Sequence, residues 1–246
     1  FDTGLSDLNL ATIFSENQFS GGDRVNDANQ ITLAVTSRLI DQKTGAQRLS
    51  ATLGERFYFS DQQVVLPGGT PRTSAQSDIL AELSTQLSNG WNADATWQFD
   101  TNQGRSIRTN IGARYQPETG KVLNLGYRFT KDSLEQIDIS TQWPLAARWS
   151  GLGRLNYSLR NHPPTDVRGP IEYLAGVEYD AGCWQGRFIF QRLATANATA
   201  TADSAYAFFF QLELGGFSKI GSNPLEIIKR NIPGYISTSE IPNATR

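Results

Sequence analysis

Residues 91–99 read Trp-Asn-Ala-Asp-Ala-Thr-Trp-Gln-Phe, and this stretch decides the fold class. Its odd-numbered residues are apolar and its even-numbered residues are polar. Successive side chains of a β-strand point to opposite faces of a sheet, so the alternation places every apolar side chain on one face. The stretch therefore predicts a β-strand with one apolar and one polar face.

The same alternation recurs along most of the chain. It is regular in segments 79–87, 91–100, 107–115, 123–130, 136–145, 154–160, 171–180 and 206–214. Segments 28–41 and 47–60 follow it with exceptions, such as Glu55 on the apolar face, and residues 1–14 follow it weakly. We expect about twelve strands, nearly all antiparallel, because most connections are too short for a crossover.

The apolar face is rich in aromatic side chains near the ends of the predicted strands. Amphipathic rings at strand ends are typical of the two interfaces of a bilayer, and a polar opposite face is typical of a water-filled lumen. We therefore predict an all-β, antiparallel transmembrane β-barrel in preference to a soluble β-sandwich or solenoid. The aromatic residues concerned are Trp91, Trp97, Phe99, Tyr115, Phe129, Trp143, Trp149, Tyr157, Tyr179, Trp184 and Tyr206.

The connections between the strands differ in length. The long ones fall on one side of the sheet, at 15–27, 61–76, 161–169 and 194–204, whereas turns such as Gly182-Cys183 are short. Outer-membrane barrels have short periplasmic turns and longer surface loops. We therefore expect the long connections outside the cell and the C-terminus in the periplasm.

Several functional classes find no support. The net charge is −2 and no basic run occurs, so a nucleic-acid partner is not expected. No stretch approaches the ~20 apolar residues of a membrane helix. His162, the only histidine, lies in a Pro-rich loop, which argues against a lipase or protease with a Ser–His pair. Without a Walker, Rossmann or zinc motif, we predict no catalytic residue, no metal and no cofactor.

The chain begins at Phe1 and contains no methionine. An open sheet edge cannot face lipid, and the first predicted strand is poorly patterned. We therefore expect the C-terminal part of a larger barrel. In this interpretation residues 1–217 belong to the barrel and residues 218–246 form a periplasmic tail.

Three groups of residues are distinctive. They are Phe19-Ser20-Gly21-Gly22-Asp23-Arg24 followed by Ala28-Asn29-Gln30 and Thr36-Ser37-Arg38; Gly176-Val177-Glu178-Tyr179 before Cys183-Trp184; and Gln211-Leu212-Glu213-Leu214 with the tail Ile227 to Pro233. In order and spacing, over nearly the whole chain, they resemble the C-terminal portion of the LptD family. That family assembles lipopolysaccharide (LPS) at the outer membrane of Gram-negative bacteria.

The resemblance implies a barrel of about 26 strands, plugged by an LptE-like lipoprotein and inserted by the barrel-assembly machinery. A missing N-terminal β-jellyroll would receive LPS from an LptA-like periplasmic bridge protein. The lipid would leave through a lateral opening between the first and last strands. The alternative is a passive porin, which would need neither this loop architecture nor a covalent link to a periplasmic domain.

The resemblance also assigns roles to residues. Ala205–Phe217 would be the last strand, on one side of the lateral gate, and loop 15–27 would fold over the lumen. The gate residues are Tyr206, Phe208, Phe210, Leu212 and Leu214, and the capping residues are Ser20, Gly21, Gly22, Asp23 and Arg24, of which Asp23 and Arg24 could pair. Six residues are expected to face the lumen: Glu172, Glu178, Asp180, Arg187, Gln211 and Glu213. They would contact the plug or the saccharide, or they would only solvate the lumen.

Cys183 is the only cysteine. An odd cysteine in an exported protein points to a disulfide partner outside the chain, and the periplasm is oxidising. The alternative is an unreactive thiol. Members of the family commonly have two adjacent cysteines here, whereas Gly182 precedes Cys183 in this chain, so we expect one disulfide instead of two.

Overall fold

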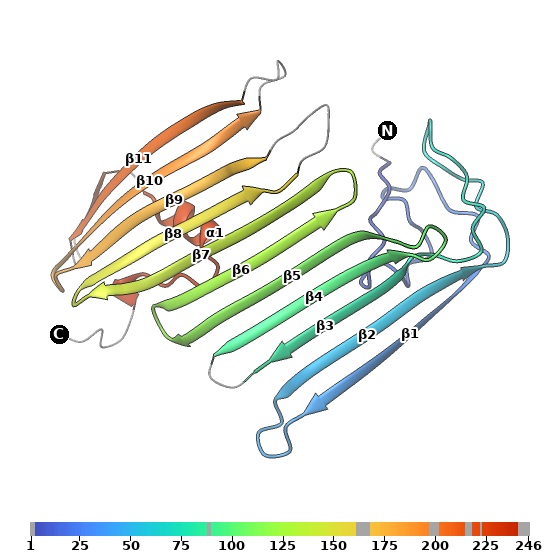
Figure 1. Cartoon of the computed structure of the whole chain (residues 1–246), viewed down its shortest axis with the longest axis horizontal. Coiled ribbons are helices and arrows are strands. Elements are labelled where there is room, and N and C mark those ends of the chain that lie inside the picture. Colours follow the sequence, from blue (N-terminus) through green and yellow to red (C-terminus); the bar gives the residue numbers. More distant parts are fainter. Residues whose placement is uncertain are drawn as a thin grey trace. The chain divides into compact units, whose positions relative to one another are not determined.

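A computed structural model of the chain describes residues 3–87, 90–160, 168–196, 202–214, 218–221 and 223–240. Twelve strands follow one another in a single sheet in the order of the sequence (Figure 1). They are β1 (Gln30–Ile40), β2 (Gln47–Tyr58), β3 (Ile79–Gln86), β4 (Trp91–Asp100), β5 (Arg105–Glu118), β6 (Lys121–Thr130), β7 (Leu134–Ala146), β8 (Trp149–Ser158), β9 (Gly169–Asp180), β10 (Trp184–Ala196), β11 (Ala202–Leu214) and β12 (Ser218–Gly221). A short helix α1 (Leu225–Asn231) and a 3-10 helix η1 (Thr238–Glu240) follow. The predicted all-β, antiparallel fold is confirmed.

The first predicted strand is wrong, although the total of twelve agrees. Residues 9–14 form a turn, in which the Asn9 side-chain oxygen accepts hydrogen bonds from the backbone N–H groups of Ala11 (2.9 Å) and Thr12 (3.0 Å). An Asn side chain that bonds to nearby backbone in this way competes with strand formation. The twelfth strand is β12, which pairs with the Gln211–Leu214 end of β11.

The chain divides into two compact units. The first contains residues 1–86, 94–111 and 129–131, and the second contains residues 87–93, 112–128 and 132–246. In the first unit one face of β1 and β2 carries exposed apolar side chains, such as Val35 (73% exposed) and Leu53 (55%). The opposite face is covered by the N-terminal residues and buries Arg56 and Tyr58. The predicted alternation of faces therefore holds here.

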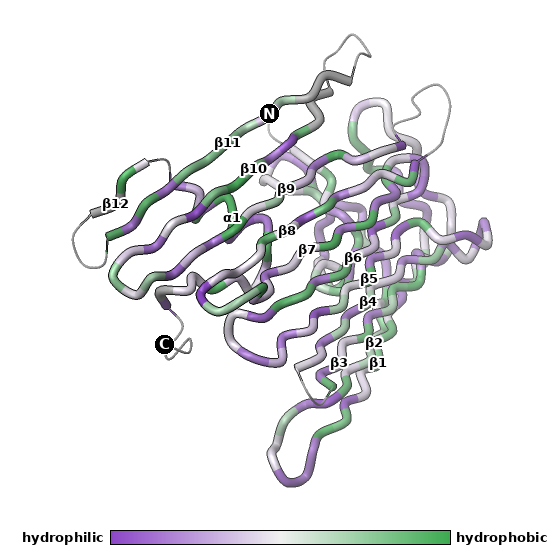
Figure 2. Tube along the Cα trace, turned by 60° about the vertical axis from the view of Figure 1, so that its left-hand side comes forward, coloured by the Kyte–Doolittle hydropathy of each residue, from purple (hydrophilic) through white to green (hydrophobic). Residues whose placement is uncertain are grey.

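In the second unit the outer face carries rows of aromatic rings. Tyr115 lies 4.6 Å from Trp91 and 6.4 Å from Trp143 between ring centroids, and Tyr179 lies 4.8 Å from Trp149 and 5.3 Å from Trp184. These residues stand at the strand ends next to the short turns, as the sequence predicts. Figure 2 shows the alternation of hydrophilic and hydrophobic residues along the strands.

The inner face of the second unit is polar except for one apolar strip. Val122, Leu152, Leu174 and Ile189 lie on β6, β8, β9 and β10, and together with Ile228, Ile232 and Tyr235 of the C-terminal segment (residues 223–240) they form a buried core. Gly176 of β9 leaves the space for Ile189, because a Cβ there would come within 2.3 Å of the Ile189 Cδ1 atom. The C-terminal segment thus packs on the inner face of the strands.

In the part of the chain that the structure describes, no helix has the length and apolarity needed to cross a membrane.

Candidate functional site

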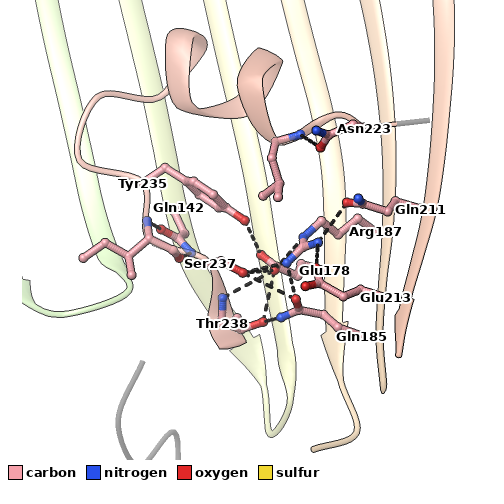
Figure 3. Close-up of polar contacts among 12 residues, drawn as sticks. Gln142, Glu178, Gln185, Arg187, Gln211, Glu213, Asn223, Tyr235, Ser237 and Thr238 are labelled. Carbon is pink, nitrogen blue, oxygen red and sulfur yellow. Dashed lines mark hydrogen bonds and ion pairs between the residues drawn. The ribbon is translucent and has the colours of Figure 1, made fainter. Parts of the chain in front are cut away.

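The best-defined polar site lies between β9, β10, β11 and the C-terminal segment, and Arg187 of β10 is its centre (Figure 3). The Arg187 guanidinium donates hydrogen bonds to Glu178 on β9 (2.9 Å), and to Gln211 (2.9 Å) and Glu213 (2.8 Å) on β11. It also donates to Ser237 (2.6 Å) and to Gln185. The side chains of Arg187 and Glu178 are fully buried. Each donor and acceptor of the pair is therefore satisfied by protein rather than by water.

Glu178 is the acceptor that holds the C-terminal segment. The Tyr235 hydroxyl donates to Glu178 Oε2 at 3.0 Å, and the Thr238 hydroxyl donates to Oε1 at 3.1 Å. Burial of Tyr235 and the negative charge of Glu178 both raise the pKa of the Tyr235 hydroxyl. Tyr235 therefore stays a protonated donor over the whole range of physiological pH.

A second arginine fixes α1 to the same face. Arg154 on β8 makes ion pairs with Asp138 on β7 (2.7 Å) and Glu172 on β9 (2.9 Å), and donates to the side chain of Asn231 in α1. Gln142 on β7 adds a two-fold contact with the backbone of residue 236, donating to its carbonyl oxygen (2.7 Å) and accepting from its N–H (3.1 Å). The C-terminal segment is thus held by side chains of β7 to β10.

The structure divides the six residues predicted to face the lumen. Glu178, Arg187 and Gln211 point inward but lie beneath the C-terminal segment, at most 1% exposed. Glu172 binds Arg154 and Gln191, Glu213 binds Arg187, and Asp180 accepts the Gly182 backbone N–H (2.7 Å) in the β9–β10 turn. The inner side chains of this wall are therefore largely bonded to the chain itself.

The residues that bind the C-terminal segment are not predicted from the sequence. One signal was present: Leu152, Leu174 and Ile189 occupy positions of the polar face, where a water-filled lumen gives no reason for large apolar side chains. A second signal was the spacing of Ile228 and Ile232, which lie on one side of a helical turn. Together they indicate an apolar partner on the inner face.

In the first unit the predicted capping loop is held by backbone contacts. Arg24 donates to the Val65 carbonyl oxygen and lies over the Phe19 ring (5.7 Å), and its pairing with Asp23 stays a prediction. The Ser20 hydroxyl bonds to the backbone of Gly4 (3.0 Å from its N–H), while Gly21 adopts a positive φ of 86°.

Two further contacts fix the two ends of this loop, at Ser15 and Asp27. Fully buried Arg56 of β2 donates to the carbonyl oxygens of Ile13 and Ser15 (2.9 Å for Ser15). At the other end, the Gln63 backbone N–H, 2.7 Å from the carboxylate, lowers the pKa of Asp27. One end of the capping loop is therefore bonded to β2, and the other end is bonded to the connection between β2 and β3.

A groove of about 340 Å³ lies between residues 8–11 and the inner face of β3, β4 and β5. Its polar lining includes Glu82, Gln98, Arg108 and Asn110. Arg108 forms an ion pair with Asp7 (3.1 Å). Leu8, Leu10, Leu80 and Trp97 also line the groove, so its surface is mixed, and the described residues contain no cluster of metal-binding side chains.

The predicted gate residues lie on β11, which is followed by β12 and is therefore not the final strand. Tyr206, Phe208 and Phe210 are 59%, 69% and 57% exposed on its outer side. Cys183 is an exposed free thiol in the β9–β10 turn. His162 and Phe217 lie outside the described residues.

A sheet with an exposed apolar face, aromatic rows at the strand ends and a charged inner face defines the class of outer-membrane β-barrel proteins. Comparison with known proteins identifies the particular family. Residues 1–149 match the family model "LptD: LPS transport system D". The chain belongs to the LptD family, which is a family of transport and assembly proteins rather than enzymes.

Similar proteins, each described as an LPS-assembly protein LptD, match almost the whole chain. The protein of Thiobacillus denitrificans is 49% identical over 98% of this chain, and that of Aromatoleum aromaticum is 45% identical over 98%. The protein of Nitrosospira multiformis is 44% identical over 97%. The chain spans only 32%, 29% and 24% of the lengths of these relatives, respectively.

Proposed function

We propose that this chain forms part of the wall of an outer-membrane barrel that transports LPS and inserts it into the outer leaflet. The observation that carries the proposal is the similarity to LPS-assembly proteins over 98% of the chain. The two faces of the sheet support it, because LPS has a polar saccharide and apolar acyl chains. A polar lumen would accommodate the saccharide, and a lipid-facing exit would accommodate the acyl chains.

The lateral gate belongs to the same proposal. Burial of acyl chains in lipid is favourable by ~0.8 kcal/mol per CH₂ group, so an exit between strands spares the chains from water. We place one side of this exit on β11, whose outer side is apolar. The other side would lie on a strand outside this chain.

The orientation and the partners are also proposed. The long connections would be extracellular and the C-terminus periplasmic, with the C-terminal segment entering the barrel from the side of the short turns. An LptE-like plug lipoprotein would contact the inner face, an LptA-like bridge protein would deliver LPS to an N-terminal domain, and the barrel-assembly machinery would insert the protein.

Depletion of the full-length protein tests the function directly. Newly made LPS, pulse-labelled after depletion, should stop reaching the cell surface and accumulate inside. Re-expression from a plasmid is the control and should restore delivery. Normal LPS delivery with reduced uptake of small solutes would instead identify a porin.

Cys183 gives a second test. We propose that its exposed thiol forms a disulfide with a cysteine in the N-terminal part of the full-length protein. Cys183→Ser should then abolish the mobility shift that a reducing agent produces on a gel. Ser74→Ala, a change in a loop of the first unit, should leave that shift intact. An unchanged shift in Cys183→Ser would disprove the disulfide.

A further inference from the structure

The side-chain contacts of β11 are distributed unevenly along the strand. On its inner side, Gln211 and Glu213 bind the buried Arg187 at 2.9 and 2.8 Å (Figure 3). The preceding inner positions with described side chains are Ala205, Ala207 and Phe209. An alanine methyl group makes no hydrogen bond, and Phe209 packs against the apolar core. Among the side chains of β11 that the structure describes, charged anchoring is therefore confined to the end near Leu214.

The edge of β11 shows the same asymmetry. β12 pairs with residues Gln211 to Leu214 and extends the sheet there. From Ala205 to Phe209, β11 pairs with β10, and no second strand borders it in the part of the chain that the structure describes. Two independent features, a buried charged network and an added strand, thus fix the same four residues.

Arg187 is the residue that joins these parts. Its guanidinium contacts β9, β11 and the C-terminal segment at once, which a lysine ammonium group lacks the geometry to do. The Glu178 partner is itself held by Tyr235 and Thr238. The position of Glu213 is therefore fixed through Arg187 to the body of the wall.

We propose that Arg187 is a positioning residue that makes the Gln211–Leu214 end of β11 a fixed hinge, so that a lateral opening at β11 develops from its Ala205–Phe209 end. The proposal rests on the proposed function, because it assumes that β11 borders the opening. It adds a direction: the strand edge separates at the end near the 194–204 connection and stays closed near the short turns.

Hydrogen–deuterium exchange on the full-length protein tests this. In the unmodified protein Gln211–Leu214 should exchange more slowly than Ala205–Phe209. Arg187→Gln should accelerate exchange at Gln211–Leu214 by about tenfold or more, because hydrogen bonds to charged groups are lost. Arg154→Gln is the matched control: it removes an equally networked arginine that contacts β7, β9 and α1 but not β11, so exchange in β11 should not change.

A second variant protects the test from a folding failure. Glu213→Gln leaves the buried Arg187–Glu178 pair intact and removes the ion pair between Arg187 and β11, at a side chain that is 22% exposed. It should accelerate exchange at Gln211–Leu214 alone, by a smaller factor than Arg187→Gln. Arg187→Lys keeps the positive charge and should restore part of the protection.

A functional readout separates positioning from stability. Entry of a large antibiotic through the outer membrane should rise in Arg187→Gln and Glu213→Gln, and not in Arg154→Gln. Uniform exchange along β11 in the unmodified protein, or equal acceleration of β11 by both arginine variants, would overturn the proposal. Hydrogen–deuterium exchange can be measured whether or not the protein transports LPS. Normal LPS delivery after depletion would therefore refute the proposed function, and the exchange experiment would still test the hinge.

Discussion

Glu178→Gln should release the C-terminal segment from the wall and lower the free energy of unfolding by about 3–5 kcal/mol, the usual cost of leaving a buried charge without its partner. Glu178 is fully buried and accepts hydrogen bonds from Arg187, Tyr235 and Thr238. The substitution preserves the shape of the side chain but removes the fully buried one of the two carboxylates that compensate Arg187, and only the partly exposed Glu213 remains. It also replaces one acceptor oxygen by an NH₂ donor that faces other donors.

Limited trypsin digestion of the full-length protein in detergent measures this release. Lys229 and Arg230 are exposed on α1, but the bound backbone should resist cleavage in the unmodified protein. In Glu178→Gln, cleavage at these residues should become rapid, and urea unfolding should show the lower stability. Glu226→Gln, the same change at an exposed position of α1, should alter neither. Unchanged cleavage in Glu178→Gln would show that the ion pair does not hold the segment.

Ile232→Ala should destabilise the second unit by about 2–5 kcal/mol, the range for deleting a buried Ile side chain to its Cβ. Ile232 is 0% exposed, in a core it shares with Ile228 and Ile189. Its removal would leave a cavity between the C-terminal segment and the inner face of the sheet. The charged network around Arg187 would remain. The decrease in the free energy of unfolding therefore measures the contribution of the apolar core alone.

Urea unfolding monitored by tryptophan fluorescence measures this change. Ile40→Ala is the control, because Ile40 is 56% exposed at the end of β1, and it should shift the midpoint only slightly. If Ile232→Ala and Ile40→Ala shift the midpoint equally, the apolar core does not stabilise the segment.

Much of the fold was accessible from the sequence because the strand signal is local. The alternation in segments such as 91–99 needs only the direction in which successive side chains point. The aromatic rings of Trp91, Trp143 and Trp184 mark strand ends because amphipathic rings favour the two interfaces of a bilayer. Residues 1–14 were misassigned because the hydrogen bonds of Asn9 to its own neighbours outweigh a weak alternation.

The site was accessible only in part. Periodicity places Glu178, Arg187 and Gln211 on the polar face of their strands, but it gives no means of knowing that the C-terminal segment covers them. The partners of Arg187 lie 9, 24, 26 and 50 residues away in the chain, at Glu178, Gln211, Glu213 and Ser237. The register between β9, β10 and β11 places Glu178, Gln211 and Glu213 next to Arg187. A reversal of the chain after β12 places Ser237 there.

The all-β class, the two-faced strands and the family follow from the sequence alone, because each depends on residue order along the chain. The coverage of the inner face of β6 to β11 by the chain's own C-terminal segment is visible only in the three-dimensional structure. Arg187 is buried with Glu178, and Ile232 is buried with Ile189. Both contacts join segments that are distant in the sequence, so a local sequence pattern does not reveal them.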